Sequence, residues 1–193
     1  MSQVEQHPLE PFLPDGAQIL FLGSFPPPRN KWSMEFFYPN WINDHWRIQG
    51  EIWFQDRDHF VDKENHCFRV EQIKAFCREK GIAFYDTAQA VRRLKNNASD
   101  AFLEVVQPTD IRALLVKIPR CKTIITTGEK ATNTVCRYFS IPAVPAVGES
   151  VPIPGESHMP ALQLLRLPSS SRAYPLSFEK KVEAYKIIKT LIK

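Results

Sequence analysis

The sequence predicts an α/β fold, a three-layer α/β/α sandwich with a central, mostly parallel sheet of four strands. Four short apolar runs bounded by turn residues have the pattern of buried strands, and segments with apolar residues at helical spacing lie between them. Strands that alternate with helices form parallel sheets covered on both faces. A chain of 193 residues is long enough for one such core and short for two, so we expect one domain over residues 1–193.

Two strands and one helix are predicted in the first half of the chain. Residues 17–22 form a short apolar run that stops at Gly23, which is the pattern of a buried strand. Residues 70–80 carry apolar side chains at helical spacing, and Gly81 follows them where glycine commonly ends a helix. Residues 82–85 are again apolar and predict the second strand.

The second half of the chain continues this alternation. Thr109 and Asp110 are residue types that cap helices. The predicted elements are a helix over 111–117, a strand over 123–126, a helix over 130–139, an irregular excursion or hairpin over 140–160, a strand over 161–167 and a final helix over 177–192. The final helix carries lysines that we expect on its solvated face: Lys180, Lys181, Lys186, Lys189 and Lys193.

Composition and charge narrow the class of protein. The net charge of +4 weakly favours a polyanionic partner. No apolar stretch reaches the roughly 20 residues of a membrane span and the N-terminus lacks a secretion signal, so we expect a cytoplasmic protein without membrane contact. The four cysteines lack the spacing of metal ligands, so we expect no metal and no cofactor. Cys77 and Cys136 fall on predicted helices as small hydrophobic residues.

Two loops at strand ends carry the clearest functional signal. The first loop, residues 23–27, follows the first strand and reads Gly-Ser-Phe-Pro-Pro. The second loop, residues 167–172, follows the fourth strand and reads Leu-Pro-Ser-Ser-Ser-Arg. The carboxyl ends of parallel strands share one edge of a sheet, and ligands of α/β proteins bind there. We therefore expect the two loops to line one crevice.

An aromatic segment follows the first loop. Residues 28–60 contain all four tryptophans, interleaved with asparagine, histidine, lysine and arginine. Aromatic and amide side chains just after a strand end are typical of a binding wall. The alternative is that the same rings form a structural hydrophobic cluster, and the sequence leaves both interpretations open.

Four motifs occur in the order and at the spacing of one known superfamily. They are the two loops, residues 81–87 (Gly-Ile-Ala-Phe-Tyr-Asp-Thr) and residues 127–131 (Thr-Gly-Glu-Lys-Ala). On these motifs the chain resembles the uracil-DNA glycosylase superfamily, most closely its hypoxanthine-DNA glycosylase branch, over roughly residues 15–190. The resemblance implies a monofunctional, cofactor-free enzyme of base excision repair that removes hypoxanthine or uracil from DNA by base flipping. The implied partner is DNA containing deaminated bases, and we expect a monomer.

The resemblance places the catalytic group outside the first loop. Phe25 stands where the uracil branch has a catalytic Asp, and a phenyl ring cannot orient water. The hypoxanthine branch carries a catalytic Asn in a later segment of the form Tyr-x-His-Pro-x-Asn-x-Phe-Trp. Residues 38–46 match that segment in length, with Asn43 at the catalytic position. They depart from it by losing the His-Pro pair and by carrying His45 in place of the Phe.

Asn43 is therefore the predicted catalytic residue. Its side-chain carbonyl would hold the attacking water, while the backbone N–H groups of Ser24 and Phe25 would face the leaving base. Asp44 or His45 is the alternative, as a general base. A third interpretation is purely structural, because an Asn ahead of a helical segment commonly caps the local backbone.

Asp86 is the predicted reader of the base. An ionised carboxylate only accepts hydrogen bonds, so Asp86 would select a ring N–H, which uracil and hypoxanthine both present. The alternative role of Asp86 is to cap the turn through Thr87. The residues expected to bind the base are Gly23, Ser24, Phe25, Pro26, Tyr38 and Asp86, and Phe37 and Trp41 are further candidates for stacking.

The second loop is expected to bind DNA, because its hydroxyl and N–H groups suit phosphates. The contacting residues would be Ser169, Ser170, Ser171 and Arg172. Arg172 or Tyr174 is the candidate to fill the gap left by a flipped base. Neither of the two loops contains a lysine, so we predict no lyase step on the sugar. The alternative is a polar turn that leads into the final helix, with Ser177 as its N-cap.

Two other functions stay open at the level of sequence. The lost His-Pro pair is compatible with a superfamily member that binds nucleic acid without cleaving it. The alternative from another class is a small-molecule-binding α/β protein, with the aromatic segment in its core and a basic tail that is merely solvated.

Overall fold

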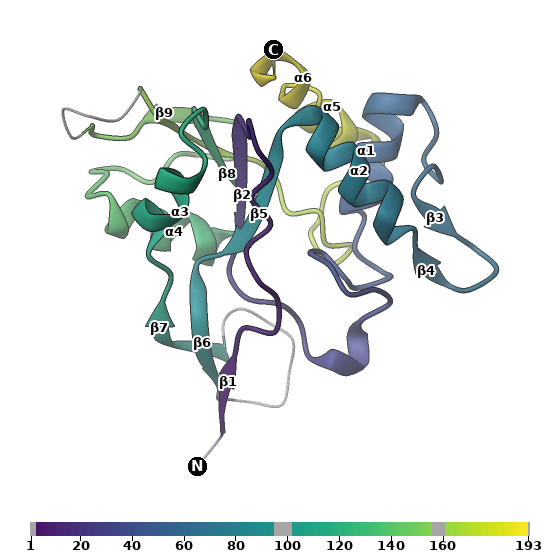
Figure 1. Cartoon of the computed structure of the whole chain (residues 1–193), viewed down its shortest axis with the longest axis horizontal. Coiled ribbons are helices and arrows are strands. Elements are labelled where there is room, and N and C mark those ends of the chain that lie inside the picture. The colour runs from purple at the N-terminus through teal and green to yellow at the C-terminus, as the bar shows by residue number, and fades with distance from the viewer. Residues whose placement is uncertain (1–2, 95–101, 156–160, 193) are drawn as a thin grey trace.

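The computed structural model describes residues 3–94, 102–155 and 161–192, and its centre is a five-stranded sheet of order β5-β2-β8-β10-β9 (Figure 1). The first four strands in this order are parallel to one another. They correspond to the four predicted strands: β2 (Ile19–Gly23), β5 (Ile82–Asp86), β8 (Thr123–Thr126) and β10 (Gln163–Arg166). The predicted α/β fold with a mostly parallel central sheet is confirmed.

Helices cover both faces of this sheet. Those of the described chain are α1 (His45–Phe54), α2 (Val70–Lys80), α3 (Ile111–Lys117), α4 (Glu129–Tyr138), α5 (Phe178–Tyr185) and α6 (Ile188–Leu191). α3 and α4 lie on one side of the sheet, and α1, α2 and α5 lie on the other (Figure 1). None of the helices in the described ranges has the length and hydrophobicity to cross a bilayer.

Local signals explain where the helices begin and end. Gly81 ends α2 in the left-handed conformation with φ 67°, which glycine adopts without steric cost. Asp110 caps α3 by accepting the N–H of Ala113 at 3.1 Å, and Ser177 caps α5 in the same way. α1 arises inside the aromatic segment, where the sequence indicates a helical segment after Asn43 but gives no bounds for it.

Two predictions for the C-terminal half need correction. The sheet has a fifth strand, β9 (Ser150–Pro152), which pairs antiparallel with β10 inside the excursion predicted over residues 140–160. Three residues that end in a proline are too short to show a strand pattern. The predicted helix over 177–192 is two helices, α5 and α6. Residues 156–160 of the excursion and Lys193 of the tail lie outside the described residues.

A second sheet also has no counterpart in the sequence prediction. It is antiparallel and consists of β1 (Val4–Gln6), β6 (Ala88–Arg93) and β7 (Leu103–Pro108), in the order β1-β6-β7. β6 begins two residues after the end of β5, so the chain passes directly from one sheet into the other. β1 thereby brings residues from near the N-terminus to the carboxyl end of β5. A short hairpin, β3 (Val61–Asp62) and β4 (Cys67–Phe68), completes the strands of the described residues.

Most rings of the aromatic segment belong to the hydrophobic core. Trp46 of α1 is fully buried, and its indole N–H donates to the carbonyl of Phe37 at 2.9 Å. The ring of Phe37 stacks on Phe84 of β5 with 5.8 Å between centroids. The structural interpretation of residues 28–60 therefore accounts for these rings, and a smaller part of the segment faces a pocket.

Candidate functional site

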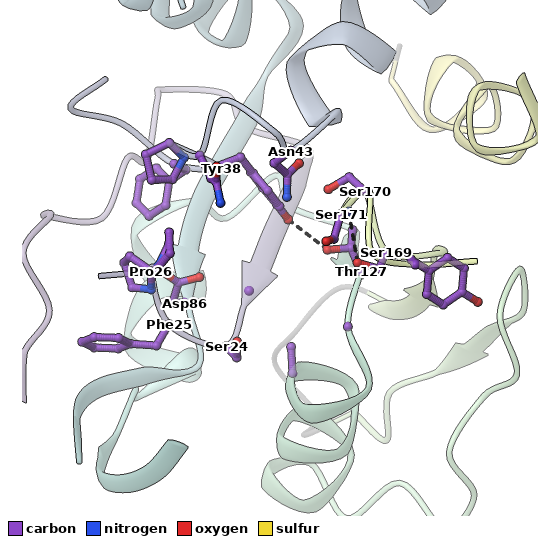
Figure 2. Close-up of a pocket in the computed structure, with 18 of the residues that line it drawn as sticks. Ser24, Phe25, Pro26, Tyr38, Asn43, Asp86, Thr127, Ser169, Ser170 and Ser171 are labelled. Carbon is purple, nitrogen blue, oxygen red and sulfur yellow. Dashed lines mark hydrogen bonds between the residues drawn. The ribbon is translucent and has the colours of Figure 1, made fainter. Parts of the chain in front are cut away.

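A pocket of about 730 Å³ opens at the carboxyl edge of the central sheet (Figure 2). Gly23 at the end of β2, Asp86 at the end of β5 and Thr127 just after β8 all line it. The second loop, which follows β10, lines the same pocket. The predicted crevice between the two loops is present, with a volume inside the roughly 300–1,000 Å³ typical of small-molecule sites.

The first loop lies tight against the end of β5. A side chain at Gly23 would place its Cβ 2.3 Å from Oδ1 of Asp86, so this close approach requires glycine. Ser24 and Pro26 line the pocket as predicted. Phe25 lines it too, but the residue is only 8% exposed, because most of its ring packs in a small hydrophobic cluster beneath the loop. Phe25 can therefore offer a bound base only a small part of its surface.

Tyr38 connects the aromatic segment to the loop after β8. Its hydroxyl lies 3.1 Å from Oγ1 of Thr127 across the pocket (Figure 2). One face of its ring lies flat on His45, with 3.9 Å between centroids and 3° between planes. These contacts hold a pocket-lining ring in place, although Tyr38 has a left-handed backbone with φ 54°.

Asn43 lines the pocket opposite the first loop, immediately before α1 (Figure 2). Its Oδ1 accepts the backbone N–H of His45 at 2.9 Å, which fixes the orientation of the amide. The nitrogen end of the side chain consequently lies on the pocket side (Figure 2). Asn43 therefore contacts the local backbone, as its purely structural interpretation predicts, and it also faces the pocket. Water held by Oδ1 would use the second lone pair of that oxygen.

Asp44 and His45, the alternative general bases, are not among the residues that line the pocket. Asp44 is buried and accepts Nε of Arg172 at 2.9 Å. His45 is completely buried, and removal from water lowers its pKa to about 3. Its Nδ1 has no hydrogen-bond partner among the described residues. A neutral imidazole without access to the pocket is poorly placed to take a proton from water.

The second loop is fixed in place through its backbone carbonyls. The carbonyl of Ser170 accepts the N–H of Asp44 at 3.0 Å, next to an isolated β-bridge between Asn43 and Ser171. The carbonyl of Pro168 accepts the hydroxyl of a tyrosine from α5 at 2.8 Å. The loop and the Asn43 segment, predicted from opposite ends of the chain, therefore lie side by side at the pocket.

Lys181 corrects the expectation for the C-terminal tail. The sequence predicts it on the solvated face of the final helix, but in the structure Lys181 is buried, with 2% exposure. Its Nζ donates to the carbonyl of Ser171 at 2.7 Å. Burial lowers the pKa of Lys181, and the nearby Asp44 opposes this by favouring the charged form. The amphipathic pattern missed this contact because Lys181 is held by a loop distant in sequence. Lys180, Lys186 and Lys189 are exposed as predicted.

The predicted DNA-contacting residues occupy different positions. Ser169 and Ser171 line the pocket and are partly exposed, whereas Ser170 is only 1% exposed. Arg172 lies outside the pocket, with a side chain that is 43% exposed and paired with Asp44. Solvent therefore reaches Arg172 far more readily than it reaches Ser170.

His7 is the residue at this site that sequence reasoning missed. Its Nε2 lies 2.8 Å from Oδ2 of Asp86, and its side chain is only 3% exposed. A single histidine in a polar N-terminal stretch gives no pattern that links it to a strand end 79 residues away. Only the pairing of β1 with β6 reveals the contact.

Within the described ranges, no cluster of three or more His, Cys, Asp or Glu side chains could hold a metal ion. All four cysteines are free, and Cys77 and Cys136 are buried on α2 and α4, where the sequence predicts small hydrophobic residues. Burial raises the pKa of both thiols, so neither is set up as a thiolate.

Comparison with known proteins finds similarity in structure but not in sequence. No protein-family model matches the chain, and no curated protein sequence matches it. Among solved structures, the chain is similar to the solution NMR structure of a "putative Uracil DNA glycosylase" from Methanosarcina acetivorans. The TM-score is 0.63 at 19% sequence identity, over 98% of this chain and 99% of the other. At this identity the likeness concerns architecture, and it identifies the fold of this chain as that of the archaeal protein.

Proposed function

We propose that this protein is a monofunctional DNA glycosylase that hydrolyses the N-glycosidic bond of a deaminated base, hypoxanthine or uracil, flipped out of DNA. The observation that carries the proposal is the convergence of three segments on one pocket. Asn43, Asp86 and the residues of the first loop all line it. The fold shared with a protein named as a putative uracil DNA glycosylase supports the same activity.

The reaction requires little chemistry from side chains. The C1′–N bond breaks and its electron pair leaves with the base, while the sugar passes through an oxocarbenium-like state. Water attacks C1′, and the proton that the water loses ends on the departing base. The protein must orient the water and stabilise the departing anion. Asn43 would orient the water, and the N–H groups of Ser24 and Phe25 would donate to the base. Among the described residues that line the pocket, the only lysine is Lys31, which is exposed, and this supports hydrolysis without a covalent intermediate.

Asp86 would select the base, and the second loop would bind the DNA backbone. The exposed guanidinium of Arg172 and the partly exposed hydroxyls of Ser169 and Ser171 suit phosphate oxygens. We retain Ser170 as a positioning residue for this loop, because it is buried.

Release of free base from duplex and single-stranded oligonucleotides containing one hypoxanthine or one uracil tests the proposal. We expect release by the wild-type chain and a reduction of about 100-fold or more in Asn43→Ala, in line with the usual contribution of a group that acts on the attacking water. Asn133→Ala on α4 provides a matched control, since it removes an amide that does not line the pocket. Unchanged release by Asn43→Ala would contradict the role of Asn43, and no release from either substrate would contradict hydrolysis.

A second candidate function is nucleic-acid binding without cleavage. The observation that favours it is the engagement of Asn43 Oδ1 by the N–H of His45, which leaves one lone pair for water. DNA binding that weakens with salt, without any release of base, would support this candidate. Absence of DNA binding at low salt would instead favour a small-molecule-binding protein.

A further inference from the structure

We propose that His7 and Asp86 form a base-reading pair, in which His7 is the positioning residue and Asp86 accepts the ring N–H of a lactam base. A lactam base carries a ring N–H beside a carbonyl, as hypoxanthine, uracil and xanthine do. The inference rests on the proposed function, and it names the feature of the base by which the same pocket would select its substrate.

The pair is built into the fold and shielded from water. β1 pairs with β6, and the N–H of His7 continues this contact by donating to the carbonyl of Gln89 at 2.8 Å. The side chains of His7 and Asp86 are 3% and 11% exposed, and Nε2 lies 2.8 Å from Oδ2. The ring of His7 packs against Tyr85 with 4.7 Å between centroids and edge-on to Phe25. A hydrogen bond in such surroundings is stronger than one in water.

The carboxylate of Asp86 is fixed on both sides. His7 holds Oδ2, while Oδ1 lies against the backbone of Gly23, close enough to exclude any side chain there. The backbone carbonyl of Asp86 accepts the hydroxyl of Thr109 at 2.7 Å. Because Asp86 lines the pocket, these contacts present a carboxylate of set orientation to a bound molecule.

The donor and acceptor pattern then follows from the chemistry of the two groups. An ionised carboxylate cannot donate, so in the proposed pair Nε2 of His7 donates to Oδ2 of Asp86. Asp86 therefore remains an acceptor for the ligand. Hypoxanthine offers N1–H and uracil offers N3–H to such a group, whereas adenine and cytosine present a lone pair at the corresponding ring nitrogen. A carboxylate would repel these parent bases, which is the discrimination that repair of deaminated DNA requires.

Four variants test the pair. His7→Leu removes the donor, His7→Gln keeps an N–H donor, and Asp86→Asn adds a donor to the group that reads the base. Glu5→Ala is the matched control on β1, because Glu5 pairs with Arg93 and does not line the pocket. Each variant is assayed for release of hypoxanthine and adenine from oligonucleotides, for binding of free hypoxanthine and 1-methylhypoxanthine by calorimetry, and for thermal stability.

We expect His7→Leu to lower kcat/KM for hypoxanthine by about 10- to 100-fold, the effect of losing one charge-assisted hydrogen bond. His7→Gln should recover part of that loss. Asp86→Asn should reduce the preference for hypoxanthine over adenine, and the wild-type chain should bind 1-methylhypoxanthine at least 10-fold more weakly than hypoxanthine. A merely structural role of His7 would lower the thermal stability of His7→Leu without changing the ratio of hypoxanthine release to adenine release. The control Glu5→Ala shows how far a loss of stability at β1 alone affects that ratio.

The outcomes separate this inference from the proposed function. The pair is refuted, while hydrolysis stands, if the wild-type chain releases base and His7→Leu releases hypoxanthine at the same rate and with the same ratio of hypoxanthine to adenine. If no base is released but free hypoxanthine binds, and binding falls in both His7→Leu and Asp86→Asn, hydrolysis is refuted while the pair stands. Equal binding of hypoxanthine and 1-methylhypoxanthine would overturn the pair in either case.

Discussion

Replacement of His45 by phenylalanine should change how the stability of the fold depends on pH. His45 is fully buried, lies flat on Tyr38 and meets the ring of Phe21 edge-on at 5.2 Å. A phenyl ring has nearly the same shape and can keep these ring contacts. His45→Phe therefore removes the titrating group with little change in packing.

The size of the effect follows from the pKa of His45. Burial lowers this pKa from the ordinary 6.5 to about 3, so between these values the unfolded chain binds a proton that the folded chain does not. Stability contributed by the neutral ring is complete above pH 6.5 and is lost as the pH falls towards 3. At pH 5, about 1.5 pH units below the unfolded value, the loss is about 2 kcal/mol, at about 1.4 kcal/mol per unit.

Urea unfolding of both chains at pH 7.5, 6 and 5 measures this effect. The difference in the free energy of unfolding, His45→Phe minus wild type, should increase by about 2 kcal/mol from pH 7.5 to pH 5. Taking this difference cancels effects of the substitution that do not depend on pH, including loss of the contact between His45 and Gln49. Parallel pH profiles for the two chains would refute the reasoning, because they would mean that burial does not suppress protonation of His45.

Three further substitutions test the loops. Gly23→Ala would push a methyl group against Oδ1 of Asp86, so we expect base release to fall by at least 10-fold; a wild-type rate would show that the carboxylate need not occupy this position. Arg172→Ala should reduce the salt dependence of DNA binding by about one phosphate contact and lower thermal stability by leaving the buried Asp44 unpaired, whereas an unchanged salt slope would exclude a phosphate contact. Lys181→Met should speed amide hydrogen exchange in the second loop, and exchange at the wild-type rate would show that the ammonium does not hold the loop.

The central sheet could be predicted because its parallel strands are covered on both faces. Such strands are continuous apolar runs, as in β8, where all four residues are buried. The second sheet lacks this signal. β1 has three residues, of which only Glu5 is even partly buried, and its partner β6 lies more than 80 residues away. A strand of this kind is defined by its tertiary partner and not by its own sequence period.

The candidate site likewise contains some residues that the sequence could place and others that it could not. The positions of Gly23, Asp86 and the second loop follow from a general property of parallel sheets, so the sequence was sufficient to place them at one edge. The contacts of His7 and Lys181 depend on how elements far apart in the chain dock together. Neither contact has a local sequence pattern, and lysine is a residue type that is usually exposed.

The start of α1 shows why a catalytic assignment depends on such contacts. Asn43 Oδ1 holds the N–H of His45, Asp44 holds Arg172, and Arg47 donates to the carbonyl of Asn43 at 3.2 Å. These bonds fix the backbone and the amide of Asn43 before any ligand arrives, and they direct its nitrogen to the pocket (Figure 2). A preorganised amide costs no reorganisation during the reaction. The same bonds restrict it to one geometry, so in the proposed reaction its contribution would depend on where a bound nucleotide places C1′ relative to the remaining lone pair of Oδ1.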